Sequence, residues 1–209
     1  MVDATTTKAA KEDDDTGAST LSVHLQELRE VLTGGIPGAT ASEHRGELTI
    51  TVDPVTLTAA LQFARDDAAT QCELLSDISA VHWPGGVMPV DVEETTGWPT
   101  YTEERDEGSI EVNYILRSVA KNHWFRIRVS LPDDDPTVAS ATGIYSSANF
   151  MEREAYDLMG VEFTGHPNLT RIMMPDDWNG HPHRKDYPLG GVEVMYKGET
   201  IPPPDERDY

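Results

Sequence analysis

The residues best suited to binding or chemistry lie in two short runs toward the C-terminal end of the sequence. The first run holds Glu152, Arg153, Glu154 and Asp157. Arg153 precedes Asp157 by four residues, which places both side chains on one face of a helix. One interpretation is an exposed surface pair worth under about 0.5 kcal/mol. The other is a charge cluster buried against a partner, where the guanidinium geometry fixes the register.

Three histidines accompany these charges, namely His166, His181 and His183. Imidazoles at positions i and i+2 of an extended segment can share a metal ion, although Pro182 restricts the backbone between the last two. The other interpretation is that each Gly-His-Pro triplet forms a tight turn whose imidazole hydrogen-bonds to neighbouring backbone.

The second run, 180–189, contains Arg184-Lys185-Asp186, a basic spot in an acidic chain. Either it is a solvated group of charges or it docks onto another surface.

Familiar catalytic motifs are missing from the sequence. It has no phosphate-binding Gly-x-x-x-x-Gly-Lys loop, no Gly-x-Ser-x-Gly elbow and no His-Glu-x-x-His pair. The single cysteine, Cys72, rules out a disulfide framework, a four-thiolate zinc site and an iron-sulfur cluster held by this chain alone. Since Cys72 stands beside Leu74 and Leu75, we expect it to be buried rather than to act as a nucleophile.

The charge balance limits the possible partners. The 209 residues include 16 Lys and Arg against 37 Asp and Glu, a net charge of −21. Nucleic acid is therefore excluded as a partner, because phosphates would be repelled over most of the surface. No apolar run approaches the roughly 18 residues of a membrane span, so we expect no direct insertion into a membrane. The N-terminal residues do not resemble a secretory signal, from which we expect a cytoplasmic protein.

Hydrophobic periodicity predicts the elements that position these residues. Leucines at 21, 25, 28 and 32 predict an amphipathic helix that ends at Gly34-Gly35. Alternation predicts strands over 48–52, 73–82, 110–118 and 124–131. A second helix is predicted from Pro54 to about Ala69, and the interval 84–108 is predicted to be a long hairpin loop or insertion.

A third helix is predicted to end at Gly160, with Asn149 and Glu152 forming a capping box at its start. The resulting fold class is α+β: a two-layer domain with helices on one face of a four- to five-stranded mixed sheet. We expect a disordered acidic tail over 1–19, the domain over 20–160, and an extended proline-rich tail over 161–209 that lies across a partner.

The two runs together resemble the signature of a known family. The string EREAYDLMGVEFTGHPNLTRIMMP from 152 to 175, closed by GHPHRKDYPL from 180 to 189, is similar to the C subunit of the proton-pumping NADH-quinone oxidoreductase, respiratory complex I. The resemblance is sharp over about 40 residues, and Thr170 and His183 depart from the usual pattern.

The resemblance implies a non-catalytic subunit of the hydrophilic arm that holds no cofactor itself. FMN, iron-sulfur clusters and quinone would be bound by partner subunits, and the implied neighbours are the D, B and I subunits. The implied location is the cytoplasmic face of the bacterial cell membrane, as a peripheral part of a membrane complex. The partner-interface positions carried over to this chain are Glu152, Arg153, Glu154, Asp157, Gly160, His166, Pro167, Arg171, His181, Pro182, Arg184, Lys185, Asp186, Tyr187 and Pro188.

Two rival functions stay open from the sequence. One is the equivalent subunit of a related complex that takes electrons from a deazaflavin or ferredoxin, or of a membrane-bound hydrogenase. The other is a free-standing metalloenzyme that uses His166, His181 and His183.

Overall fold

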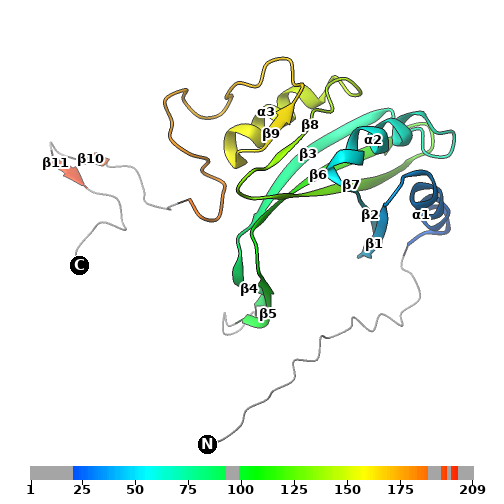
Figure 1. The fold of residues 1–209 in the computed structure, drawn as a ribbon, viewed down its shortest axis with the longest axis horizontal. Helices are drawn as coiled ribbons and strands as arrows, with labels where there is room; N and C mark the ends of the chain where they lie inside the picture. Colours follow the sequence, from blue (N-terminus) through cyan, green and yellow to red (C-terminus); the bar gives the residue numbers. More distant parts are fainter. Residues whose placement is uncertain (1–20, 93–98, 188–193, 197–198, 202–209) are drawn as a thin grey trace, which may run out of the picture.

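A computed structural model of the chain describes residues 21–92, 99–187, 194–196 and 199–201. The expected acidic tail over 1–19 therefore lies outside the described residues. The core of the fold is a mixed five-stranded sheet in the order β1-β2-β7-β6-β3, with helices packed on one face (Figure 1). The predicted α+β fold class is confirmed.

The N-terminal helix α1, Val23–Gly35, is capped by Ser22, whose side chain accepts a hydrogen bond from the Leu25 N–H. Its buried face carries Leu28 and Leu32, as the leucine spacing predicts. The next element, the hairpin of β1 (Thr40–His44) and β2 (Glu47–Thr51), is only half predicted from the sequence. The short strand β1 has no buried residue, so its sequence lacks the apolar alternation of a strand.

Asp53 opens the second helical segment, because its carboxylate accepts from the Val55 N–H at 2.9 Å. A short 3₁₀ turn, η1 (Pro54–Thr56), leads into α2 (Leu57–Asp66), which ends three residues earlier than predicted. Three long strands follow: β3 (Leu74–Trp83), β6 (Ser109–Ser118) and β7 (His123–Pro132). The inward side chains of β6 and β7 alternate with outward ones, so these strands agree with the prediction within two residues.

The interval 84–108 contains a second hairpin, made by β4 (Gly86–Val92) and β5 (Pro99–Arg105). Beyond β7, the short strands β8 (Thr137–Ala139) and β9 (Glu162–Thr164) pair in parallel on either side of α3 (Ala148–Met159) in the sequence. Near the C-terminus, β10 (Val194–Tyr196) and β11 (Glu199–Ile201) form a separate antiparallel pair.

Helix α3 packs beside the edge strand β3. Its C-terminal end agrees with the sequence-based prediction, whereas its N-terminal cap does not. It ends at Gly160, whose φ of 80° is the left-handed conformation that favours glycine. The predicted capping box is wrong: Ser147 occupies the N-cap position without a side-chain hydrogen bond. Glu152 turns into the protein instead and is fully buried.

Candidate functional site

Helix α3 directs two carboxylates of the signature into the protein rather than toward solvent. Glu152 and Asp157 both have fully buried side chains. A buried carboxylate is costly unless hydrogen bonds satisfy it. The partners of each group therefore show what it stabilises.

Glu152 holds the turn that follows β8. Its two carboxylate oxygens accept hydrogen bonds from the Ser140 hydroxyl and the Ala141 N–H, each at 2.6 Å. The His166 imidazole lies 4.0 Å away. Burial raises the pKa of Glu152 above its ordinary value, against the opposing effect of these hydrogen bonds and of His166. Glu152 thus joins α3 to the 140–141 turn within the chain.

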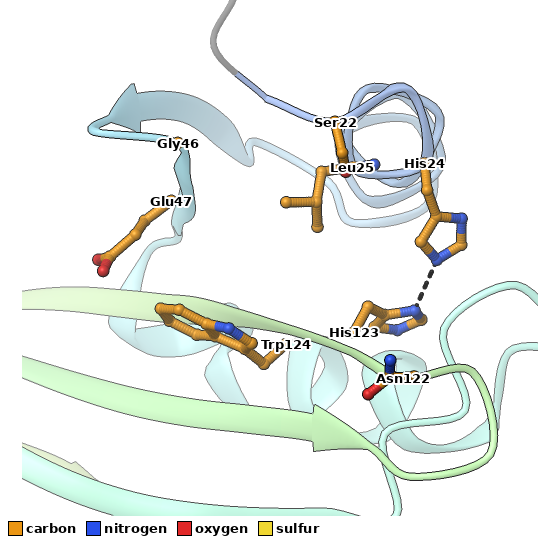
Figure 2. Close-up of a pocket in the computed structure, with 8 residues that line it drawn as sticks. All are labelled: Ser22, His24, Leu25, Gly46, Glu47, Asn122, His123 and Trp124. Atoms are coloured by element: carbon orange, nitrogen blue, oxygen red, sulfur yellow. Dashed lines mark hydrogen bonds between the residues drawn. The ribbon is translucent and has the colours of Figure 1, made fainter.

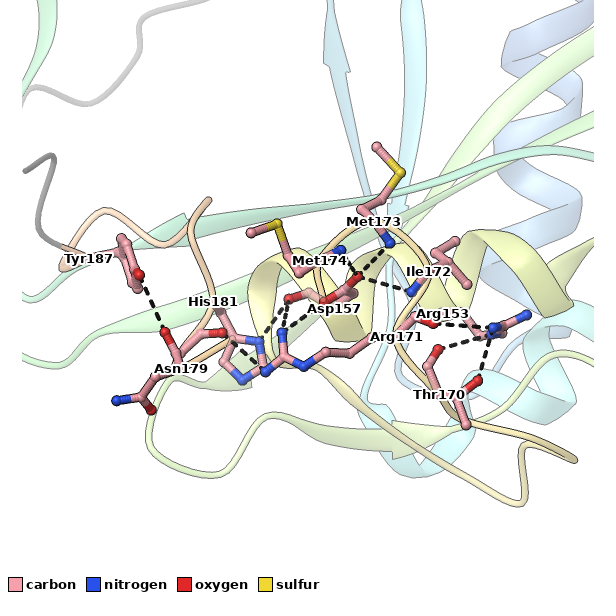
Figure 3. Close-up of polar contacts among 11 residues, drawn as sticks. Arg153, Asp157, Thr170, Arg171, Ile172, Met173, Met174, Asn179, His181 and Tyr187 are labelled. Carbon is pink, nitrogen blue, oxygen red and sulfur yellow. Dashed lines mark hydrogen bonds and ion pairs between the residues drawn. The ribbon is translucent and has the colours of Figure 1, made fainter. Parts of the chain in front are cut away.

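Asp157 organises the loop that follows β9 (Figure 3). One carboxylate oxygen accepts from the backbone N–H groups of Ile172, Met173 and Met174 at 3.0, 2.7 and 2.8 Å. The other accepts from the Arg171 guanidinium at 2.8 Å. Burial alone would raise the pKa of Asp157, but these four donors outweigh it and lower the pKa below its ordinary value. The carboxylate is therefore ionised and fixes the course of residues 171–174.

Arg171 and His181 extend this network to a third segment. Arg171 also donates to the Gly180 carbonyl at 3.2 Å, and His181 Nδ1 lies 3.0 Å from the Asp157 carbonyl oxygen. In Figure 3 the Tyr187 hydroxyl donates to the Asn179 carbonyl oxygen at 3.3 Å. One helix turn around Asp157 thereby holds both signature runs.

The predicted pairing of Arg153 with Asp157 is wrong. Arg153 donates to the Thr170 carbonyl at 3.0 Å, to the Thr170 hydroxyl at 2.9 Å and to the Arg171 carbonyl at 3.3 Å (Figure 3). Its guanidinium also lies 5.5 Å from the centre of the Phe150 ring. Asp157 points inward, so the two side chains do not meet although their spacing permits it.

The segment Arg184-Lys185-Asp186 is attached to the sheet by a histidine that the sequence analysis missed. The buried His82 of β3 accepts the Lys185 N–H on Nδ1 at 2.9 Å. Arg184 donates to the Asp133 carbonyl at 3.0 Å and to the Asp186 carboxylate at 3.1 Å. The hydrogen bond from Arg184 lowers the pKa of Asp186. A cleft of about 460 Å³ remains between β3, the end of α3 and residues 182–187.

These contacts keep residues 161–187 on their own domain, whereas the sequence suggests that everything after residue 160 extends away from it. The prolines do keep the segment out of the five-stranded sheet. The reason for the difference is that buried polar groups on α3 and β3, rather than apolar side chains, attach the segment. Wrapping of a partner by this segment stays a prediction.

The histidines of the two Gly-His-Pro triplets, His166 and His181, both contact backbone atoms, as the turn interpretation predicts. His166 Nε2 lies 3.1 Å from the Asn149 carbonyl oxygen, and its Nδ1 accepts the Asn168 N–H at 3.0 Å. His183 is exposed, and its own N–H donates to the Leu158 carbonyl at 3.0 Å. Within the described part of the chain, no group of three or more His, Cys, Asp or Glu residues is arranged to hold a metal ion.

The remaining signature positions divide by exposure. Gly160 lies at the end of α3, where an added Cβ would come within 2.8 Å of the His181 ring. Glu154, Pro167, Lys185 and Asp186 are exposed, and Pro188 lies outside the described residues. The carboxyl and guanidinium groups therefore form the framework, and other side chains present a surface.

Three exposed apolar side chains lie next to these charged positions. Phe150, Ile172 and Met173 are 66%, 37% and 62% exposed, and they lie on the two segments that Arg153 joins. Exposed apolar side chains on a backbone fixed by buried charges are typical of a protein interface. Chemically, this arrangement can dock a partner.

A second candidate site is a recess between the start of α1, the β1–β2 turn and the start of β7 (Figure 2). The recess of about 170 Å³ is lined by His24 and His123, whose Nε2 and Nδ1 atoms lie 2.9 Å apart, and by Trp124. Burial and the neighbouring His24 lower the pKa of His123. Cys72 lies 3.8 Å from His123 but is fully buried, as predicted, and burial raises its pKa to about 12. The thiol is therefore protonated and not a nucleophile.

No helix in the described residues is both long enough and apolar enough to cross a membrane.

Comparisons with known proteins agree with the signature. The profile of a family described as the respiratory-chain NADH dehydrogenase, 30 kDa subunit, matches residues 50–193. The C subunit of the NADH-quinone oxidoreductase of Mycolicibacterium gilvum is 44% identical over 164 residues, covering 78% of this chain and 64% of the relative. The Nocardia farcinica C subunit is 41% identical over 190 residues, covering 88% and 67%. The chain thus spans less than two thirds of the Mycolicibacterium gilvum relative's length.

Solved structures share the fold. A trypsin-resistant fragment of Nqo5 is 26% identical with a TM-score of 0.50, covering 70% of this chain and 99% of the fragment. A chain of the membrane-bound sulfane sulfur reductase, an archaeal respiratory membrane complex, has a TM-score of 0.54 over 78% of this chain and 85% of its own. Its 22% identity shows a common fold alone. The family profile covers more than half of the chain, and the chain belongs to the family of the 30 kDa subunit of the respiratory-chain NADH dehydrogenase.

Proposed function

We propose that this chain is the C subunit of a bacterial NADH-quinone oxidoreductase, respiratory complex I, and that it acts by positioning its neighbours. In this role it has no catalytic residue and no cofactor. It supports the subunit that binds quinone while electrons pass from NADH to quinone and protons are translocated. The relatives at 44% identity have that name, which favours complex I over a deazaflavin-, ferredoxin- or hydrogenase-type relative.

The observation that carries the proposal is the way Asp157 holds the 171–174 loop. Four hydrogen-bond donors converge on one buried carboxylate, yet the loop that they fix leaves Met173 62% exposed. Such a network costs desolvation energy that a solvent-exposed loop would not need. A loop whose backbone is already ordered loses less conformational entropy on binding a partner than an unordered loop would.

The proposed neighbours are the D, B and I subunits of the hydrophilic arm, on the cytoplasmic face of the membrane. The FMN, the iron-sulfur clusters and the quinone are proposed to belong to these and other partner subunits. For the clusters, the reason is that a chain with one buried thiol has too few thiolates to ligate one. The C-terminal residues after Tyr187 are proposed to lie across a partner. The contribution to electron transfer is then one of distance and orientation.

The test is a competition for assembly. Cells express the wild-type chain together with a Met173→Asp variant, and the complex is purified from membranes through a tag on another protein of the complex. We expect the variant to be at least about 30-fold under-represented, the effect of losing a strong interface contact. Mass spectrometry of the two forms of the peptide gives the ratio.

Val55→Asp is the matched control, since Val55 is 90% exposed on η1 and lies outside the signature. It should enter the complex as well as wild type does. Equal incorporation of the two variants would refute the proposed interface. A wild-type chain that does not copurify with redox subunits would refute the proposed function itself.

A further inference from the structure

The outer face of the five-stranded sheet, on the side away from the helices, is neutral in an otherwise acidic protein. Along each strand, the residues that point to this face alternate with the buried ones. The charged residues that point to this face are three arginines and three carboxylates: Arg117, Arg126, Arg128, Glu47, Asp77 and Glu111. The whole chain has a net charge of −21. This face therefore repels an acidic protein surface less than the rest of the molecule does.

One row across this face holds an arginine and a tryptophan, two residue types enriched at interface hot spots, beside an exposed leucine. Leu74 of β3 pairs with Arg117 of β6, and Arg117 pairs with Trp124 of β7. Directly opposed residues have Cβ atoms about 4.5–5.5 Å apart, so the three side chains are neighbours. Leu74 is 41% exposed and Trp124 is 39% exposed.

Arg117 differs from the other two arginines of the face. Arg126 is paired with Glu47 at 3.0 Å, and Arg128 lies 3.5 Å from Glu111. Arg117 is exposed and has no ion pair or hydrogen bond to its side chain within the described part of the chain. A guanidinium between two apolar side chains is suited to a carboxylate from outside.

The surroundings of the row are also ordered and apolar. Glu73 accepts the Val119 and Ala120 N–H groups at 2.9 and 3.3 Å, which fixes the β6–β7 turn and leaves Val119 65% exposed. On the other side, the Trp124 ring borders the recess of about 170 Å³ that Leu25 also lines (Figure 2). The recess has room for one apolar side chain beside the row.

We propose that the row Leu74–Arg117–Trp124 binds a segment of a partner protein that presents a carboxylate to Arg117 and an apolar side chain to Trp124. This surface is separate from the signature loop, and the inference rests on the proposed function because it requires a protein partner. The chain's own residues 1–20 include Glu12 to Asp15 but have almost nothing apolar to cover Trp124. Charge and apolar contact together therefore favour another protein.

The test is again a competition for assembly, in which cells co-express the wild-type chain with one variant. The variants are Arg117→Glu, Trp124→Ser and the control Arg29→Glu. Arg29 is exposed on α1, and its substitution changes the charge by the same amount. We expect the first two variants to be depleted from the purified complex by about 30-fold or more, as for interface hot spots, and Arg29→Glu to remain at parity. Total cellular abundance of each variant, measured in the same lysate, corrects for any loss of folding.

Three outcomes overturn the inference. Parity of Arg117→Glu with Arg29→Glu, while Met173→Asp is depleted, removes this surface and leaves the proposed function intact. If deletion of residues 1–18 increases the oxidation of Trp124 by hydroxyl radicals in the free chain, the chain's own tail is the occupant. Absence of the wild-type chain from the complex overturns both proposals.

Discussion

Replacing Asp157 by Asn should release the 171–174 loop without changing the shape of the side chain. The substitution removes the charge that three backbone N–H groups and Arg171 share. A hydrogen bond to a charged group is worth about 1 kcal/mol more than a neutral one, and the carboxamide would also leave the guanidinium without its ion pair. Since the loop is partly open to water, we estimate a loss of about 3 kcal/mol in the free energy of opening the loop.

Amide hydrogen exchange measures this opening directly. A loss of about 3 kcal/mol corresponds to exchange about 100-fold faster at Ile172, Met173 and Met174. Glu154→Gln is the matched control, because Glu154 lies exposed on the same helix and its removal should leave those amides unchanged. An increase of less than about threefold in the exchange rates of Asp157→Asn would show that the Asp157 charge does not hold the loop closed.

The sign of the pH dependence follows from the lowered pKa of Asp157. A carboxyl group whose pKa is lower in the folded state stabilises that state above its ordinary pKa, which is 3.8. The contribution is lost as the pH falls through the lowered value. At neutral pH the full effect is present, and the wild-type and Asp157→Asn loops should become equally labile in strong acid.

Three further predictions concern stability and reactivity. The raised pKa of Glu152 means that folding favours its protonated form. The stability of the wild type relative to Glu152→Gln should therefore rise as the pH falls from the raised pKa toward 4.5. Urea titrations at several pH values measure this difference. If the pH profiles coincide, the burial argument is wrong. Gly160→Ala should lower the unfolding free energy by about 1–3 kcal/mol, because the φ of Gly160 is 80° and an added Cβ would meet the His181 ring. Gly34→Ala, in the last turn of α1 where a Cβ has open space, should instead raise the unfolding free energy by about 0.5–1 kcal/mol. The two variants should therefore shift the melting temperature in opposite directions, and shifts of the same sign would contradict this. Cys72, buried with a pKa of about 12, should react with iodoacetamide only as fast as the chain unfolds, and rapid labelling of the folded chain would contradict its burial.

Local patterns in the sequence are sufficient to predict part of this fold. Strict alternation from Phe125 to Leu131 identifies β7 because one face of that strand is buried and the other is open. Strand β1 has no such contrast, and its only signal is Arg45-Gly46, whose positive φ angles form the two-residue turn of the hairpin. A turn signal without flanking apolar alternation is not enough to place a strand.

The site is harder to predict than the fold, because its partners are distant in the sequence. The spacing rule for helices pairs Arg153 with Asp157, but Asp157 binds backbone groups 15 to 17 residues further along the chain. His82 accepts from a residue 103 positions away. Patterns within a short stretch of sequence cannot reveal contacts between residues this far apart along the chain. The sequence therefore identifies which residues matter but not what they contact.

In the proposed function, this chain positions other subunits and takes no part in the chemistry. The most direct test measures NADH-quinone turnover per assembled complex in membranes that carry Met173→Asp. We predict that total activity falls in proportion to the amount of complex assembled, while turnover per complex equals that of wild type. Full assembly with a lower turnover per complex would contradict the claim.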